Sequence, residues 1–361
     1  MNEPDVYAKI QQQLDQKLPF VVYNKPGSDV LTMFSQDDDT VYEVGAYSNS
    51  GFIFAPFDSS KRAVFFPFNR STSYNATILD QESIAQGQST NISGATEDSI
   101  EKNMHLELVK SGVKTIESGG VKKVVLSRKE IITNDEAFDP LAMFQRLIKK
   151  YSKAFVYLWF HPRVGMWLGA TPETLLQSKD HTFNTMALAG TQPYKTDETT
   201  VWADKEIEEQ EMVTDFILKE LSPVANDIVS SKTYTHRAGT LLHLRTDIKG
   251  KLNSYPSGIE DVVKILHPTP AVCGVPKGKA KSFILKHEGY DRKFYTGFLG
   301  ELNIQNDKGV VSNLFVNLRC MELKGKEAYL YVGGGITKDS DPEKEWEETV
   351  RKTETMKNVL F

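Results

Sequence analysis

The order of apolar segments in this 361-residue chain predicts an α+β fold built on large antiparallel sheets. Short runs of β-branched and aromatic residues follow one another at hairpin spacing, which is typical of antiparallel strands. Segments with helical periodicity interrupt these runs at several places. The hydrophobic content of 40% is enough for a sizeable core, so we expect a globular protein.

The first hundred residues are predicted to form one helix followed by a β meander. The helix is expected from Val6 to Leu14. Strands are expected at 20–23, 41–44, 52–54 and 64–66, where residues of high β propensity lie between Gly, Pro, Asp and Ser. Residues 81–96 are rich in Gln, Ser, Thr and Gly and lack periodicity, so we expect a surface loop there.

The rest of the chain continues with helices and strand runs. Helices are predicted at 97–111, 139–151, 203–226, 258–266 and 277–287. Strands are predicted at 121–128, 154–161 and 166–170, in two runs that end at Thr191, in a run through His243 and Arg245, and at 294–304, 314–323 and 328–332. A last helix is expected to start near Asp341-Pro342, because Pro suits the first helical position.

The composition limits the classes of function. Forty-three basic and 48 acidic residues, without long runs of either sign, give a formal charge of −5, which argues against a nucleic-acid surface. The N-terminus lacks the pattern of a signal peptide, and the longest apolar run, Ala154 to Phe160, is too short to span a membrane. Cys273 and Cys320 lie in separate apolar segments, which fits buried thiols in a reducing compartment. We therefore expect a cytoplasmic protein that binds a small molecule.

The stretch from Tyr329 to Lys352 is a candidate ligand site. It combines an apolar strand, the glycine triplet 333–335, a polar turn, and a helix on which Glu345, Glu348 and Lys352 share one face. Glycines have no Cβ, so a ligand can approach their backbone closely. A flexible turn before a solvated charged helix explains the same residues, and the stretch alone leaves both interpretations open. A nucleotide loop is excluded, because neither G-x-G-x-x-G nor G-K-[ST] is completed.

Polar residues also interrupt apolar segments at five other places. They are Lys123, Glu173, Glu209, His243 and Arg319. Each has a structural explanation: a Lys or Arg at a strand end extends to water, a Glu in a long helix is solvated, and a lone His in an apolar run is a hydrogen-bonded core residue. Spacing in the sequence does not show whether the five converge.

Nine segments between about residues 120 and 355 carry a resemblance to a known family. They are KVVLSR at 123–128, ATPE at 170–173, LAGT at 188–191, EEQEMV at 208–213, HPTPAVCG at 267–274, DR at 291–292, YTG at 295–297, VNLRC at 316–320, and GGGI at 333–336 with EWEET at 345–349. Together and in this order they resemble the chorismate-utilising enzymes, and within that family most closely the isochorismate synthases. The N-terminal third is similar to the family only in general character.

The resemblance implies a two-layered α+β body with helices outside and the active site between its halves. It implies one chorismate-binding catalytic domain over residues 1–361, with a variable β-rich part at 1–115 and the motif-bearing part at 116–361. It also implies Mg²⁺ as the cofactor, held by the carboxylates of Glu209 and Glu348, and oxygen ligands of this kind suit the ion. The family often has His after the first of these glutamates, where this chain has Gln210.

By the same resemblance, the reaction is the isomerisation of chorismate to isochorismate, in which water adds at C2 of the ring and the C4 hydroxyl leaves. Lys123 is implied to be the base that activates water, and Glu173 the acid that protonates the leaving hydroxyl. These roles require a lowered pKa for the lysine and a raised pKa for the glutamate. Arg319 is implied to bind the enolpyruvyl carboxylate. The other implied substrate-binding residues are Gly190, Thr191, His243, Ala271, Tyr295, Gly333 and Lys352.

Two alternatives stay open. A salicylate synthase would use the same base and acid and then eliminate pyruvate, and only the compact length of this chain argues against it. A non-catalytic chorismate-binding protein would not need both groups. The ammonia-using relatives usually have Gln at the position of Lys123, so no glutaminase subunit is expected. The expected protein is a monomer, and its product would feed menaquinone or siderophore synthesis.

Overall fold

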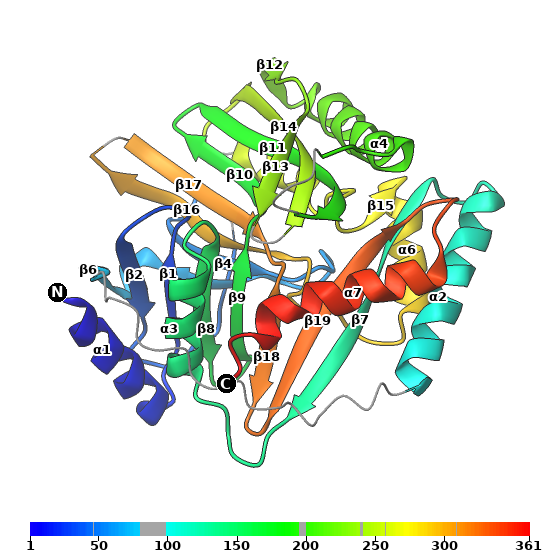
Figure 1. Ribbon diagram of the computed structural model, residues 1–361. Helices are drawn as coiled ribbons and strands as arrows, with labels where there is room; N and C mark the ends of the chain where they lie inside the picture. The colour runs from blue at the N-terminus through cyan, green and yellow to red at the C-terminus, as the bar shows by residue number, and fades with distance from the viewer. Residues whose placement is uncertain (46, 80–98, 195–199, 239–240, 257, 308) are drawn as a thin grey trace.

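The structure, a computed structural model, describes residues 1–45, 47–79, 99–194, 200–238, 241–256, 258–307 and 309–361. Two large antiparallel sheets pack face to face with helices on their outer sides, so the predicted α+β fold is confirmed (Figure 1). The loop predicted at 81–96 lies outside the described residues. In the described ranges, no helix is both long and apolar enough to cross a membrane.

Nine strands form the first sheet. In spatial order they are β15 (Gly274–Val275), β7 (Lys123–Thr133), β19 (Glu327–Ile336), β18 (Cys320–Lys324), β9 (Gly165–Thr171), β8 (Phe155–His161), β1 (Phe20–Asn24), β2 (Val30–Ser35) and β6 (Thr72–Thr77). Ten strands form the second sheet. They are β12 (Ala225–Ser230), β14 (Leu241–Leu252), β11 (Thr182–Pro193), β10 (Thr174–Lys179), β17 (Gly309–Val316), β16 (Phe298–Asn306), β4 (Gly51–Ala55), β5 (Val64–Pro67) and β3 (Tyr42–Glu43), with β13 (Tyr234–Ala238) paired to β14.

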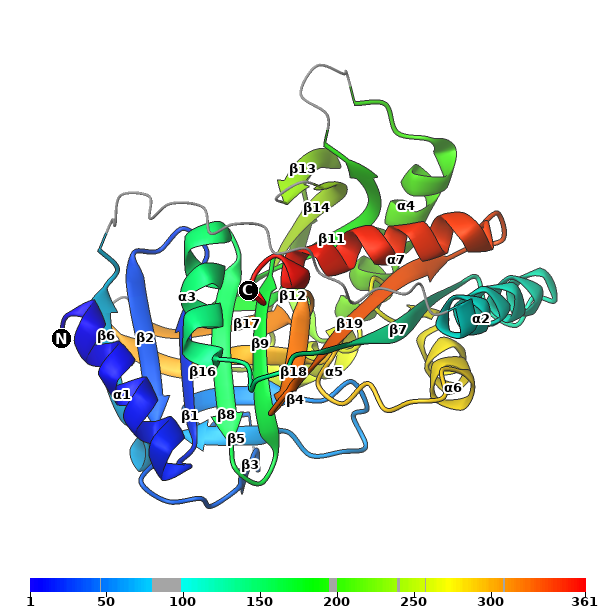
Figure 2. The same cartoon turned by 60° about the horizontal axis from the view of Figure 1, so that its bottom comes forward.

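Helices cover the outer side of each sheet. The first sheet is covered by α1 (Glu3–Gln16) and α3 (Pro140–Lys150), and the second by α4 (Asp204–Leu221) and α5 (Gly258–Leu266) (Figure 2). The helices α2 (Ser99–Glu117), α6 (Lys277–His287) and α7 (Pro342–Lys357) gather around β7 and β19 at one end of the first sheet. A single 3-10 turn, η1 (Phe68–Arg70), follows β5.

The central strands are buried on both faces, because helices cover one face and the opposite sheet covers the other. In β1, Phe20 and Val22 pack in the cluster beneath α1 and α3, whereas Val21 and Tyr23 pack in the cluster between the sheets. The cluster between the sheets is rich in aromatic rings, which stack across it. The unbroken apolar run of β1 follows from this double burial.

The predicted β meander of the N-terminal third is wrong. The strands β1, β2 and β6 belong to the first sheet, whereas β3, β4 and β5 belong to the second. No strand was predicted at β2 or β6. High β propensity identifies a strand, but the sheet it joins depends on partners far away in the sequence, as when β1 pairs with β8.

Several predicted boundaries are also wrong, although α5 and α6 have the predicted bounds. The helix predicted to end at Ser111 continues to Glu117, and the strand predicted at 294–304 begins at Phe298. The helix predicted at 203–226 ends at Leu221, because Pro223 cannot continue it, and Ala225 begins β12. The strand predicted at 314–323 is broken between Val316 and Cys320. The strand predicted to end at Val332 continues as β19 through the glycine triplet 333–335, which pairs with β7.

Candidate active site

The chain passes between the two sheets twice at the same place. It leaves the first sheet after β9 through Glu173, and it returns from β17 through Arg319. These two connections are bonded to each other: Val316 N donates to the Glu173 carbonyl at 3.0 Å, and Ala170 N donates to the Arg319 carbonyl at 3.0 Å. The backbone at Glu173 and the backbone at Arg319 are therefore held close together where the sheets meet.

The connection at Arg319 is strained. Arg319 has φ +47°, in the left-handed region that a residue with a Cβ seldom adopts. The neighbouring Asn317 holds this turn, because its amide donates to the Phe294 carbonyl at 2.9 Å and its Oδ1 accepts from Tyr157 at 2.7 Å. Because the predicted strand is broken between Val316 and Cys320, the Arg319 side chain faces the site.

A cavity of about 940 Å³, including its part open to solvent, lies at this junction. Eleven of the twelve predicted site residues line it: Glu173, Gly190, Thr191, Glu209, His243, Ala271, Tyr295, Arg319, Gly333, Glu348 and Lys352. The twelfth, Lys123, is fully buried at the start of β7, and its Nζ lies 2.8 Å from Glu209 Oε1. The structure thus brings all twelve together from ten segments of the chain.

Glu173 has the environment that an acid requires, and Lys123 is buried beside a carboxylate. Burial raises the pKa of Glu173 to about 7, although the nearby charges of Lys123 and Arg319 oppose the rise. Lys123 Nζ contacts Glu209 as an ion pair without hydrogen-bond geometry, and it has no hydrogen-bond partner among the described residues. A buried ammonium with free donor positions suits a site for an anionic or polar ligand.

A β-bulge positions His243 and the backbone opposite it. In the pairing of β11 with β14, Gly190 and Thr191 together oppose the single residue His243. Gly190 has φ +70°, which glycine adopts without strain, and an added Cβ would lie 3.1 Å from Glu206. His243 Nδ1 lies 2.9 Å from the Gly190 carbonyl, so this nitrogen carries the proton in the neutral ring. Burial and the charge of Arg319 lower the pKa of His243 to about 3.

Two helices bring carboxylates to the same strand. Glu209 lies on α4 and Glu348 on α7, and both reach the glycines of β19: a Cβ on Gly335 would lie 2.7 Å from Glu209 Oε1, and a Cβ on Gly334 would lie 3.7 Å from Glu348 Oε1. A side chain at position 335 would therefore displace Glu209, whereas the distance between a Cβ at position 334 and Glu348 is an ordinary van der Waals contact. Burial alone would raise the pKa of Glu348, but Lys352 at 2.5 Å outweighs it and the pKa is lowered.

Lys352 completes the wall formed by α7. Its Nζ also donates to the Gly333 carbonyl at 3.0 Å, which ties the helix to β19. The N-terminus of α7 is stabilised by a cap: Pro342 is its first residue, and the Asp341 side chain accepts a hydrogen bond from Lys344 N. The predicted common face of Glu345, Glu348 and Lys352 is observed, and it points toward the glycines.

Sequence reasoning missed Lys205, which also lines the cavity. Its Nζ lies 3.1 Å from Glu345, which is buried. Burial by itself would lower the pKa of Lys205, but Glu345, Glu209 and Glu348 together raise it. A signal was available: Lys205 precedes Glu209 by four residues, so both lie on one face of α4. Val125 and Thr296 also line the cavity, and no pattern in the sequence indicated them.

The carboxylates Glu209 and Glu348 fit a hard divalent cation. In the part of the chain that the structure describes, no three His, Cys, Asp or Glu side chains are arranged to hold a metal ion. Two carboxylates suit an ion that keeps water and accepts ligand oxygens, as Mg²⁺ does. Ions that require a complete set of protein ligands, such as structural zinc, do not fit this donor set.

Comparison with known proteins defines the class. A family model described as "Chorismate binding enzyme" matches residues 66–361, which is more than half of the chain. The chain belongs to this family, as the resemblance of its nine segments indicated.

The relatives are isochorismate synthases. The chain is 33% identical over 249 residues to isochorismate synthase EntC of Escherichia coli K12, across 66% of this chain and 62% of the relative. It is 30% identical over 268 residues to isochorismate synthase DhbC of Bacillus subtilis 168, across 70% of this chain and 66% of the relative. The matched region thus spans somewhat less than two thirds of these relatives.

Solved structures share the fold. A putative 2,3-dihydroxybenzoate-specific isochorismate synthase, DhbC of Bacillus anthracis, has a TM-score of 0.79 at 23% identity, covering 97% of this chain and 99% of that one. The menaquinone-specific isochorismate synthase MenF of Escherichia coli has a TM-score of 0.78 at 22% identity, covering 95% and 89%. At these identities the likeness supports the two-sheet architecture.

Proposed function

We propose that this protein is an isochorismate synthase that converts chorismate to isochorismate. The observation that carries the proposal is the pair Glu173 and Lys123. Glu173 is a buried acid that lines the cavity and has a pKa near neutrality, and Lys123 is a buried lysine that contacts the cavity residue Glu209. The names of relatives that are 30% and 33% identical support the same activity.

The proposed reaction divides the proton transfers between these two residues. Lys123 Nζ in its neutral form removes a proton from water, whose oxygen bonds to C2 of the ring. The double-bond electrons shift, and the C–O bond at C4 breaks. Glu173 gives its proton to the departing hydroxyl, so that water leaves. A water is added and a water is lost, which makes the product an isomer of the substrate.

The other cavity residues hold the substrate. Arg319 offers a planar set of donors to the enolpyruvyl carboxylate. Lys352 balances the second negative charge of chorismate. His243, neutral because of its lowered pKa, orients the substrate together with Thr191 and the Gly190 backbone. Tyr295, Ala271 and Gly333 shape the remaining wall.

Glu209 and Glu348 are the proposed ligands of Mg²⁺. When bound, the ion neutralises and orients the ring carboxylate of chorismate.

The metal assignment is tested by substituting two neighbouring glutamates of α7. Glu348→Gln should raise the Mg²⁺ concentration needed for half-maximal activity at least tenfold, because a charged ligand is lost. Glu347→Gln should leave it unchanged, since Glu347 is exposed. An equal response of both variants would contradict the assignment.

The activity is tested with purified protein, chorismate and Mg²⁺, with the products separated directly. We expect isochorismate in equilibrium with chorismate, and loss of turnover when a chelator is added. Accumulation of salicylate and pyruvate would instead identify a salicylate synthase. Binding of chorismate without turnover would identify a non-catalytic binding protein.

The assignment of the base is tested by Lys123→Gln. General acid–base catalysis contributes about 10²- to 10⁴-fold, so turnover should fall by this amount. Circular dichroism and the unfolding transition check that the variant is folded. Wild-type turnover in a folded Lys123→Gln variant would disprove the role.

We also propose that the protein acts in the cytoplasm as a monomer without a glutaminase subunit. The buried, unpaired Cys273 and Cys320 support a reducing compartment. Gel filtration with light scattering measures the oligomeric state, and a dimer would contradict the proposal. Turnover that requires added ammonia or glutamine would contradict the absence of a glutaminase.

A further inference from the structure

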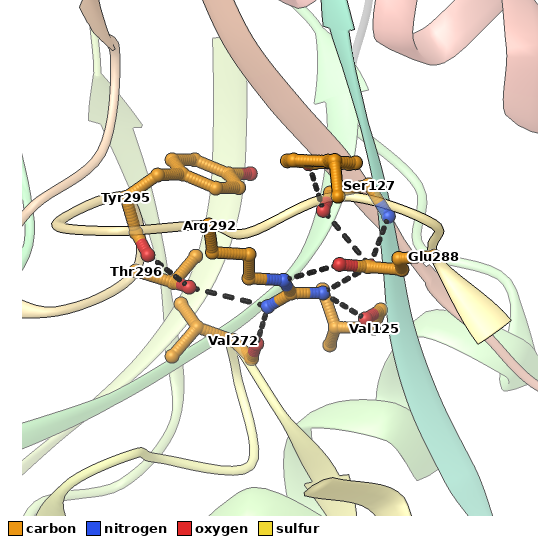
Figure 3. A network of polar contacts seen from close by, with 8 residues as sticks. Val125, Ser127, Val272, Glu288, Arg292, Tyr295 and Thr296 are labelled. Atoms are coloured by element: carbon orange, nitrogen blue, oxygen red, sulfur yellow. Dashed lines mark hydrogen bonds and ion pairs between the residues drawn. The ribbon is translucent and has the colours of Figure 1, made fainter. Parts of the chain in front are cut away.

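A buried ion pair lies directly behind one wall of the cavity. Glu288, just after α6, and Arg292 have side chains that are only 1% and 2% exposed. Arg292 Nε donates to Glu288 Oε2 at 2.7 Å, and Arg292 Nη2 donates to Glu288 Oε1 (Figure 3). Neither side chain lines the cavity.

The guanidinium of Arg292 joins three segments that are far apart in the sequence. It donates to the Val125 carbonyl of β7 at 2.7 Å, to the Val272 carbonyl in the connection after α5 at 3.0 Å, and to Thr296 Oγ1 at 3.1 Å (Figure 3). Glu288 adds a second bond to β7, because Oε1 accepts from both the backbone N and the Oγ of Ser127 at 2.8 Å. Arg292 thus bonds to all three segments, and Glu288 bonds both to Arg292 and to β7.

Each of these segments presents a residue of the proposed site. Lys123 precedes Val125 by two residues, Ala271 is adjacent to Val272, and Tyr295 is adjacent to Thr296. Three residues that bond to Arg292 also line the cavity: Val125, Val272 and Thr296. The β7–β15 pairing and the bond from Val125 N to the Cys273 carbonyl also join two of these segments. Among these contacts, the guanidinium of Arg292 is the group that bonds to all three at once.

The backbone at Thr296 needs such support. Thr296 is β-branched and has φ +58°, a strained conformation that persists only where neighbours hold it. Its N donates to the Asn317 carbonyl at 2.9 Å, and its Oγ1 donates to the Tyr295 carbonyl at 2.6 Å while accepting from Arg292. Arg292 is one of the contacts that fix Tyr295 against the cavity.

We propose that Arg292, oriented by Glu288, is a positioning residue of the active site that sets the spacing of the Lys123 strand, the Ala271 connection and the Tyr295 turn. The proposal rests on the proposed function only for its effect on turnover. Apolar residues of the same volume would fill the space without the cost of burying two charges. What they would not supply is a rigid, planar set of donors for two carbonyls, a hydroxyl and a carboxylate at once.

The test is Arg292→Lys in the full-length protein. Lysine keeps the charge but has one nitrogen, which cannot reach all three segments and the carboxylate together. We expect kcat to fall 10- to 100-fold, as a displacement of about 1 Å in a catalytic group does, with a smaller change in KM. Amide hydrogen exchange of the free protein should speed up together in residues 123–127, 270–273 and 294–297.

Two further variants keep the proposal falsifiable if Arg292→Lys unfolds. Ser127→Ala removes the hydroxyl bonds to Glu288 and to Tyr290 but keeps the backbone bond to Glu288, and it should lower kcat several-fold in a folded protein. Glu301→Gln is the matched control, because Glu301 is also a buried carboxylate, bonded to Tyr23 and Lys25 away from the cavity. It should lower the unfolding midpoint without changing kcat or exchange in the three segments.

The outcomes separate this inference from the proposed function. If wild-type protein forms no isochorismate, the proposed function fails, while the exchange experiment still tests the spacing of the segments. If wild-type protein is active and a folded Arg292→Lys variant keeps its kcat and its exchange pattern, the positioning role is disproved. A kcat loss equal to that of Glu301→Gln at matched stability would also disprove it.

Discussion

The burial that suits Glu173 to act as an acid also lowers the stability of the folded protein at neutral pH. Its pKa is about 7 in the folded protein and 4.5 in a model peptide, because burial disfavours the charged form. Between these values the folded protein holds a proton that the unfolded chain releases. The contribution of Glu173 to the free energy of unfolding is therefore most favourable below pH 4.5. It falls by about 3 kcal/mol in total as the pH rises through 7.

Glu173→Gln should remove this loss. We expect the variant to be more stable than the wild type by up to about 3 kcal/mol at pH 8, and nearly equal to it at pH 4.5. Urea unfolding of both proteins at the two pH values measures the difference. An equal stability difference at both values would show that Glu173 is not the titrating group. The same variant should lose turnover about 10²- to 10⁴-fold.

The pH dependence of turnover should carry the signature of the same carboxyl group. As the acid, Glu173 must be protonated, and the protonated fraction falls tenfold per pH unit above its pKa. The acid-dependent limb of kcat/KM should therefore decline above about pH 7. Initial rates at subsaturating chorismate between pH 6 and 9 measure this limb. A kcat/KM that still rises from pH 7 to 9 would contradict the role.

At the scale of elements, β19 and the helices α4 and α7 depend on one another. The glycines of β19 admit carboxylates from both helices, and Lys352 of α7 bonds back to the strand. An added methyl group at Gly333 or Gly335 would lie 2.7 Å from the nearest atom, so neighbouring atoms would have to shift. The proposed substrate wall therefore combines the glycine backbone at residues 333–335 of β19 with charged side chains from two helices.

Gly335→Ala tests this fit. The new Cβ would lie 2.7 Å from Glu209 Oε1 and 3.1 Å from Lys123 Cε, so both side chains must move. We expect turnover to fall at least tenfold and the half-saturating Mg²⁺ concentration to rise. Gly278→Ala is the control, because nothing lies within 4 Å of its new Cβ on α6. It should keep full turnover and gain about 0.5–1 kcal/mol of stability. Full activity of Gly335→Ala would contradict the close approach.

At the scale of the whole molecule, the N-terminal third completes both sheets. Its strands join β8 in the first sheet and β16 in the second, and its side chains fill the cluster between them. We propose on this ground that the chain folds as one domain. The division at residue 115 then marks where the family motifs begin, without marking a folding boundary.

Removal of residues 1–115 should therefore abolish folding. The fragment 116–361 would expose the inner faces of β8 and β16, including Phe155 and Trp159, which are fully buried. We expect it to aggregate and to show no cooperative transition in urea. A soluble fragment with a cooperative transition would show that the motif-bearing part is a domain by itself.

The sequence by itself determined the class of fold and most of the helices, and its family resemblance named twelve residues that gather at the cavity. Helix periodicity is a local signal, which is why α5 and α6 were predicted with their observed bounds. The twelve residues were found because a family resemblance carries information about contacts that spacing does not contain.

Only the tertiary structure decided how these residues meet. It placed the N-terminal strands in two sheets, broke a predicted strand at Arg319, and kept the glycine triplet within β19. It also showed that Lys205 lines the cavity and that Arg292 lies behind it. The physical reason is the same in each case: strand pairing, burial and the pKa of Glu173 depend on neighbours that are distant in the sequence and close only in the folded chain.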